Sequence, residues 1–132
     1  MLVPGTTYFV VLPGLADIEQ MADAEAYAAA FHDACGMPLI VGDTADRDAV
    51  SRVLAEHGVG TVMHFAAHTV VPESVSNPLK YYGNNTCATR NLLECCDRAG
   101  VKSFVFSSTA AVYGIPAEGV AREETPTAPI NP

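Results

Sequence analysis

Positively charged side chains are scarce in this 132-residue sequence. Lysine and arginine together number 7 against 15 aspartates and glutamates, which gives a formal net charge of -8 at pH 7. Binding to the phosphate backbone of a nucleic acid depends on lysine and arginine, and so does attraction to an anionic membrane surface. We therefore expect neither a nucleic acid nor a membrane surface as a partner.

Signals for export or membrane insertion are also lacking. No lysine or arginine precedes Arg47, so the opening MLVPGTTYFVVLPGLA has no positive region ahead of its apolar run, as a secretory signal requires. No apolar run approaches the roughly 20 residues that span a bilayer. The sequence therefore predicts a cytoplasmic protein. Residues 8–12 are expected to form a short strand instead of part of a signal.

Motifs for a metal ion or a disulfide framework are missing as well. The four cysteines show no C-x-x-C spacing, and the adjacent Cys95 and Cys96 do not easily bridge each other. His32, His57 and His68 lack the spacing of metal ligands. We expect no metal site, and reduced cysteines that pack as small apolar residues.

Strand-like apolar runs alternate with helical patterns along the chain. Hydrophobic residues make up 49% of it, enough for one domain with a buried core. The predicted strands cover residues 8–12, 39–42, 61–66 and 103–107, and the predicted helices cover 17–35, 46–57 and 78–99, with a short helical turn at Pro72. This order is typical of a parallel sheet with helices on both faces, and we expect the last three strands to be parallel neighbours.

Two helical stripes are expected to face the core. In the helix expected at 46–57 the stripe consists of Val50, Val53, Leu54 and His57. In the second, which begins with Asn77 as N-cap and Pro78, it consists of Leu79, Tyr82, Thr86, Thr89, Leu93 and Cys96. We expect Gly58 and Gly100 to end these helices. His64, in the strand expected at 61–66, is expected to be a core histidine with its hydrogen bonds satisfied.

Small or polar residues follow three of the predicted strands, at 42–44, 65–69 and 107–109. Ligands of an open parallel sheet bind beyond the carboxyl ends of its strands, so we expect Asp43, Ala67 and Thr109 to lie along one edge. Ala66 and Ala67 let a flat or diphosphate ligand approach the backbone closely. Asp43 either accepts hydrogen bonds from a ribose or an amine, or only begins a turn.

Two further polar features leave alternatives open. Ser107, Ser108 and Thr109 offer three hydroxyls in a row, which serve either a ligand or a turn. Asn85 lies on the expected inward face of the helix at 78–99, where a buried amide needs partners from a ligand or from the backbone.

The motifs that complete a dinucleotide site are not found. The turn after residues 8–12 has only Pro13-Gly14-Leu15 in place of G-x-G-x-x-G, and no acidic residue ends that strand. No Tyr-x-x-x-Lys follows Thr109 in the sequence.

The stretches PESVSNPLKYYGNN and VFSSTAAVYG resemble UDP-glucose 4-epimerases, members of the extended short-chain dehydrogenase/reductase family. The resemblance runs from about Pro38 to Pro132. It implies a truncated Rossmann-like domain that binds NAD. It further implies an epimerase that interconverts UDP-glucose and UDP-galactose by passing a hydride to NAD and returning it to the opposite face of the sugar. A UDP-sugar substrate and a homodimer are the partners that it implies.

The resemblance also implies roles for individual residues. Thr109 matches the serine or threonine that hydrogen-bonds the sugar 4-hydroxyl, and is the expected catalytic residue. The expected cofactor-binding residues are Asp43 and Thr44 at the adenine, the loop of Phe65, Ala66, Ala67, His68 and Thr69 under the adenosine and diphosphate, and Asn85, Ser107 and Ser108. Thr69 stands where the family often has a lysine.

Departures from the family pattern divide the chain into three parts. Residues 1–37 are an atypical N-terminal segment, 38–114 form the family-like core, and 115–132 are an extended C-terminal loop. The glycine-rich loop and the Tyr-x-x-x-Lys of the family have no counterpart, so we expect a fragment or decayed copy that is inactive alone and binds NAD weakly. The alternatives are a fragment of a related NAD-dependent nucleotide-sugar dehydratase or decarboxylase, and a non-catalytic remnant that binds a nucleotide or a partner protein.

Overall fold

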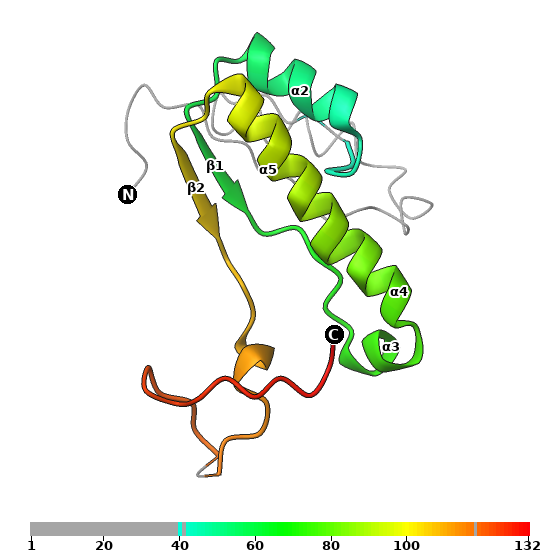
Figure 1. Ribbon diagram of the computed structural model, residues 1–132, viewed down its shortest axis with the longest axis vertical. Helices are drawn as coiled ribbons and strands as arrows, with labels where there is room; N and C mark the ends of the chain where they lie inside the picture. Colours follow the sequence, from blue (N-terminus) through cyan, green and yellow to red (C-terminus); the bar gives the residue numbers. More distant parts are fainter. Residues whose placement is uncertain (1–39, 41, 118) are drawn as a thin grey trace, which may run out of the picture.

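The computed structural model describes residues 40, 42–117 and 119–132 (Figure 1). Its elements, in chain order, are α2 (Arg47–Glu56), β1 (Thr61–His64), α3 (Val71–Ser76), α4 (Pro78–Tyr81), the π-helical segment η2 (Tyr82–Cys87), α5 (Ala88–Ala99), β2 (Ser103–Phe106) and the 3-10 helix η3 (Ala110–Tyr113). The elements expected at 8–12 and 17–35 lie outside the described residues, as do residues 39 and 41 of the strand expected at 39–42. No helix in the described ranges is long and apolar enough to cross a membrane.

The two strands pair in parallel. Thr61 is opposite Ser103 and His64 is opposite Phe106, and the helices from α3 to α5 form the crossover that joins the strands. Of the three strands expected to be parallel neighbours, those at 61–66 and 103–107 are confirmed. The described residues 40 and 42 are not in a strand, so the pairing of residues 39–42 stays a prediction. Among the described helices, however, α2 and α5 cover the same face of the sheet, and Val105 on the opposite face is 46% exposed (Figure 1).

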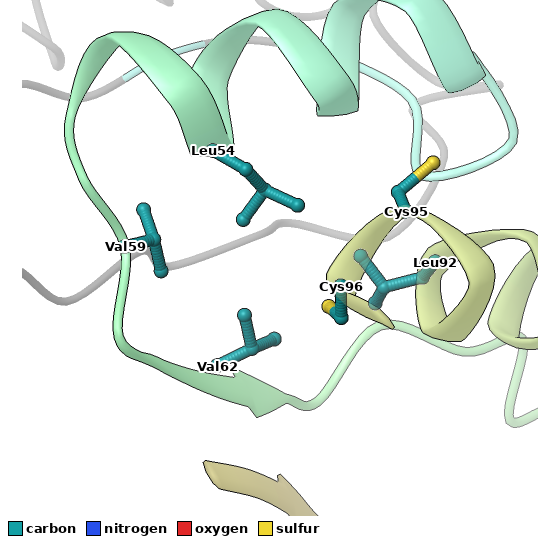
Figure 2. Close-up of a cluster of buried hydrophobic side chains, with 6 residues drawn as sticks. All are labelled: Leu54, Val59, Val62, Leu92, Cys95 and Cys96. Carbon is teal, nitrogen blue, oxygen red and sulfur yellow. The ribbon is translucent and has the colours of Figure 1, made fainter. Parts of the chain in front are cut away.

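The core lies where α5 packs between β1 and α2. Figure 2 shows side chains from all three elements, and from the link between α2 and β1, pointing toward one another. The buried members are Leu54, Val59, Val62, Leu92, Cys95 and Cys96. Of the cysteines in the described part, Cys95 and Cys96 are buried free thiols, as expected, whereas Cys87 is exposed. Burial raises the pKa of the Cys96 thiol, so this cysteine behaves as an apolar core residue.

The ends of α2 follow from local chemistry. The Asp46 side chain caps the helix by accepting hydrogen bonds from the backbone N–H groups of Asp48 and Ala49. Gly58 follows the C-cap residue with a φ of 56°, so the chain turns where the sequence predicts. Leu54 is buried and Val50 packs against the core, which confirms the central part of the expected stripe.

The helix expected at 78–99 contains a π turn that the spacing does not predict. Asn77 is the N-cap residue of α4, but its side chain makes no capping hydrogen bond. The expected inward stripe is wrong at Leu79, Tyr82 and Leu93, which are 81%, 50% and 45% exposed, whereas Cys96 is buried as predicted. The other buried positions of this helix are Tyr81, Ala88, Leu92 and Cys95. The inward face of α5 combines Leu92 with the small residues Ala88, Cys95 and Cys96, and α5 packs against α2.

An ion pair joins the two helices that cover the sheet. Arg47 of α2 lies 2.6 Å from a carboxylate oxygen of Glu94 on α5, and Arg90 contacts the other oxygen at 3.0 Å. Both arginines hold the pKa of Glu94 below its usual range, with Arg47 the larger cause. The pair therefore favours the folded state while Glu94 is ionised.

The C-terminal tail (residues 115–117 and 119–132) contains turns but neither helix nor strand. It runs back across the molecule to α3 (Figure 1). The Ala128 N–H donates a 2.8 Å hydrogen bond to the Val112 carbonyl, which fixes the tail against η3. Gly114 permits this contact, because its φ is 61° and a Cβ at this position would overlap the Ala128 oxygen.

Glu94→Gln is expected to lower stability near neutral pH and to matter little in acid. The folded-state pKa of Glu94 is depressed. Its stabilising effect is therefore present above the ordinary glutamate pKa of about 4.3 and is lost as the pH falls through the folded-state value. Urea unfolding at several pH values measures this. Glu56→Gln, on the exposed side of α2, is the control, and a difference between Glu94→Gln and wild type that does not shrink in acid would contradict the prediction.

Gly114→Ala is expected to release the tail from η3. The new Cβ would overlap the Ala128 oxygen, and a positive φ costs a non-glycine residue about 1–2 kcal/mol. Hydrogen exchange of the Ala128 amide should then accelerate by roughly tenfold. Gly119→Ala is the matched control, since Gly119 also has a positive φ but a Cβ added there would have no atom within 4 Å. Equal exchange rates in the two variants would show that the contact with Ala128 does not hold the tail.

Candidate functional site

A cavity of about 370 Å³ lies at the carboxyl ends of β1 and β2. Because the strands are parallel and paired in register, the segments that leave them enter the same space. The walls come from the end of β1 with residues 65–69, from α3, and from the helix that runs from α4 to α5. The end of β2 with residues 107–109 and Ala111, and residues 131–132, complete them.

Most of the predicted site residues meet at this cavity. Those that line it are Phe65, Ala66, Ala67, His68, Thr69, Asn85, Ser107, Ser108 and Thr109. Asp43 and Thr44 are not among the lining residues. Asp43 accepts a 2.8 Å hydrogen bond from the Ala45 N–H, so its carboxylate begins a turn, and Thr44 is buried. The contact of this pair with an adenine stays a prediction.

The loop after β1 is fixed by a side-chain amide. Asn85 accepts a 2.8 Å hydrogen bond from the His68 N–H and donates a 3.0 Å hydrogen bond to the His68 carbonyl. Of the two alternatives for Asn85, the structure thus shows the backbone contact. Asn85 lies in the π turn of η2, a kind of helix irregularity that is frequent at functional sites.

The hydroxyl residues after β2 combine turn geometry with an open side chain. Ser108 has a φ of 55°, uncommon for a residue other than glycine, which marks a constrained backbone at the cavity. Thr109 caps η3 by accepting a 3.2 Å hydrogen bond from the Ala111 N–H. The Thr109 hydroxyl therefore serves the turn as an acceptor and keeps its proton for donation.

His64 is a core residue whose hydrogen bonding is only half satisfied. It is 1% exposed, its Nε2 lies 2.7 Å from the Thr89 hydroxyl, and its ring lies against Phe104 and Phe106. The buried Nδ1 has no hydrogen-bond partner. Burial lowers the pKa of His64, so the ring is neutral at neutral pH and the prediction of full satisfaction is wrong for one nitrogen.

Tyr81 lines the cavity but is already engaged. Its hydroxyl lies 2.8 Å from the Val70 carbonyl and 2.9 Å from a carboxylate oxygen of Glu73, which also pairs with Lys80 at 2.5 Å. Burial and Glu73 raise the pKa of Tyr81, so its hydroxyl stays protonated at neutral pH and does not act as a base. Its ring packs against His68 at 5.5 Å and thereby supports the loop that Asn85 fixes.

The cavity also contains residues that the sequence does not predict. Ser74 on α3 and Asn131 in the tail both line it and are joined by a 3.3 Å hydrogen bond. No spacing rule connects residues 57 positions apart. The only local signal is the Asn131-Pro132 dipeptide, which marks a turn.

The described lining residues of the cavity include polar side chains but no lysine, arginine, aspartate or glutamate. Neither lysine nor arginine is among the lining residues of the described part of the chain. Within the same part, no cluster of three histidine, cysteine or acidic residues is arranged to hold a metal ion. The chemistry available is hydrogen bonding from hydroxyls, amides and the backbone, beside the small Ala66 and Ala67.

Comparison with known proteins assigns the family. The family model described as GDP-mannose 4,6 dehydratase matches residues 14–132. The UDP-glucose 4-epimerase of Azospirillum brasilense is 53% identical over 96 residues, which cover 73% of this chain and 28% of that protein. That of Bacillus subtilis is 47% identical over 90 residues, or 68% of this chain and 26% of that protein. The chain thus spans little more than a quarter of the length of these curated relatives.

Solved structures of the same enzymes share the fold. The UDP-Glc/GlcNAc 4-epimerase of Campylobacter jejuni has a TM-score of 0.75 and 38% identity, covering 92% of this chain and 35% of that one. UDP-glucose 4-epimerase of Bifidobacterium longum, solved with NAD+ and UDP, has a TM-score of 0.69 and 39% identity, covering 78% of this chain and 31% of that one. The chain has a Rossmann-like α/β fold, belongs to the GDP-mannose 4,6 dehydratase family, and is similar to the UDP-glucose 4-epimerases over the part of them that it spans.

Proposed function

We propose that this chain forms the NAD- and nucleotide-sugar-binding part of a UDP-glucose 4-epimerase, which interconverts UDP-glucose and UDP-galactose. One observation carries the proposal. The loop at residues 65–69 and the hydroxyls of Ser107, Ser108 and Thr109, which the resemblance links to cofactor and substrate, line one cavity. The names of the relatives support an epimerase over the dehydratase or decarboxylase alternative.

The residues present fit NAD along this wall. Ala66 and Ala67 leave room for a flat or diphosphate group against the backbone, and Asn85 holds the His68 backbone in place beside them. Ser107 and Ser108 add hydroxyls at the end of β2. When bound, NAD supplies the acceptor and donor of a hydride. Because neither lysine nor arginine is among the described lining residues, the fit depends on shape and hydrogen bonds.

Thr109 is the residue that we assign to the sugar. Its hydroxyl accepts from Ala111 and has a proton left, so it hydrogen-bonds a sugar hydroxyl without acting as a base. An unperturbed hydroxyl is too weak a base near neutral pH without an activating partner. Asp43 and Thr44 as adenine contacts, a homodimer, a cytoplasmic location and a place in galactose metabolism belong to the same proposal.

NAD should bind the 132-residue chain weakly, and Asn85→Ala should weaken binding further. The substitution removes both hydrogen bonds to the His68 backbone and so loosens the loop. We expect a roughly three- to tenfold loss of affinity by isothermal titration calorimetry, given about 0.5–1.5 kcal/mol for a typical hydrogen bond. Thr86→Ala, an exposed change in the same π turn, is the control and should leave affinity unchanged. No NAD binding by the wild-type chain would reject the cofactor site proposed here.

The 132-residue chain should not epimerise UDP-galactose, even with NAD. General acid–base catalysis typically contributes 10²–10⁴-fold, and no Tyr-x-x-x-Lys follows Thr109 in these residues. The assay measures UDP-glucose formed from UDP-galactose over days, against buffer. Turnover above buffer that disappears in Thr109→Ala would show that the catalytic machinery has been misjudged.

A further inference from the structure

The C-terminal tail places the side-chain amide of Asn131 at the cavity, and the roles described so far do not include this amide. Asn131 contacts Ser74 of α3, and it follows the contact of the tail with η3 at Ala128. Asn131 lines the cavity together with Pro132 and belongs to a different wall from that of Thr109. The tail therefore adds lining residues to the cavity, beside those from α3 and η3.

The hydrogen bonds of Ser74 fix which way this amide points. Ser74 is 1% exposed, and its hydroxyl donates a 2.7 Å hydrogen bond to the Val71 carbonyl. With its proton committed, the Ser74 oxygen is only an acceptor, so the Asn131 group beside it at 3.3 Å is the NH₂. One donor of the amide is thus engaged, and among the described residues its oxygen accepts no hydrogen bond.

We propose that Asn131 is a sugar-binding residue, whose Oδ1 accepts a hydrogen bond from one hydroxyl of the hexose in a nucleotide sugar. The proposal rests on the function proposed above and adds a residue to it. An oriented amide oxygen attracts a donor and repels an anion, so it suits a hydroxyl and not a phosphate. Thr109, on the wall formed by the end of β2, offers the complementary donor. A hexose presents several hydroxyls that both donate and accept, which fits a cavity with an acceptor on one wall and a donor on another.

Binding measurements on the 132-residue chain separate the sugar from the rest of the ligand. UDP-glucose, UDP and NAD are each titrated by calorimetry into wild type and Asn131→Ala. We expect UDP-glucose affinity to fall about three- to tenfold, as for the loss of one neutral hydrogen bond, with UDP and NAD unchanged. Asn77→Ala is the matched control, because Asn77 is exposed, makes no side-chain cap and does not line the cavity. Ser74→Ala should reduce UDP-glucose affinity less than Asn131→Ala, since it only frees the amide to rotate.

Deoxy analogues of UDP-glucose identify the hydroxyl and test a direct contact. One analogue in the 2-, 3-, 4- and 6-deoxy series should bind wild type and Asn131→Ala equally, because it lacks the hydrogen-bond donor. An equal loss for UDP and UDP-glucose, or for NAD, would overturn the proposal, as would the same loss with every deoxy analogue. Binding of UDP-glucose to wild type with no effect of Asn131→Ala would overturn this inference alone. If wild type binds neither UDP-glucose nor NAD, the proposed function is overturned and this inference with it.

Discussion

The cavity depends on the parallel pairing of β1 with β2, in a register that sets His64 opposite Phe106. With both strands ending at the same level, the loop after β1 and the hydroxyl residues after β2 leave the sheet side by side and line the same space. A two-stranded sheet is marginal on its own. The pair is therefore held by packing, through the cluster around Val62 and Leu92 that α2 and α5 complete (Figure 2).

The helical crossover serves both the core and the site. Leu92, Cys95 and Cys96 at its carboxyl end bury the sheet, whereas Asn85, one π turn earlier, holds the backbone of His68. The π-helical segment η2 thus holds the loop after β1, and α5, which follows it, packs in the core. The loop is held both by the Asn85 amide and by the packing of the His68 ring against Tyr81.

Much of this arrangement follows from local sequence patterns, and the remainder from contacts that such patterns do not contain. Gly58 and Gly100 end their helices as predicted, and the apolar runs at 61–66 and 103–107 hold the paired strands. Leu79 is exposed although it fits the helical spacing, because spacing records apolarity and not which face packs against the sheet. Ser74 and Asn131 meet only because the tail folds back, a long-range contact without a local signal.

The two asparagines that line the cavity, Asn85 and Asn131, differ in their hydrogen bonds, and we therefore assign them different roles. Asn85 commits both its oxygen and its nitrogen to His68, so it has little capacity left for a ligand and acts on the site through the loop. Among the described residues, Asn131 engages only its nitrogen, with Ser74. Neither lysine nor arginine is among the described lining residues of the cavity, so the function that we propose assigns selectivity to such oriented amides and hydroxyls. A site of this kind distinguishes ligands by the placement of their hydroxyls more than by their net charge.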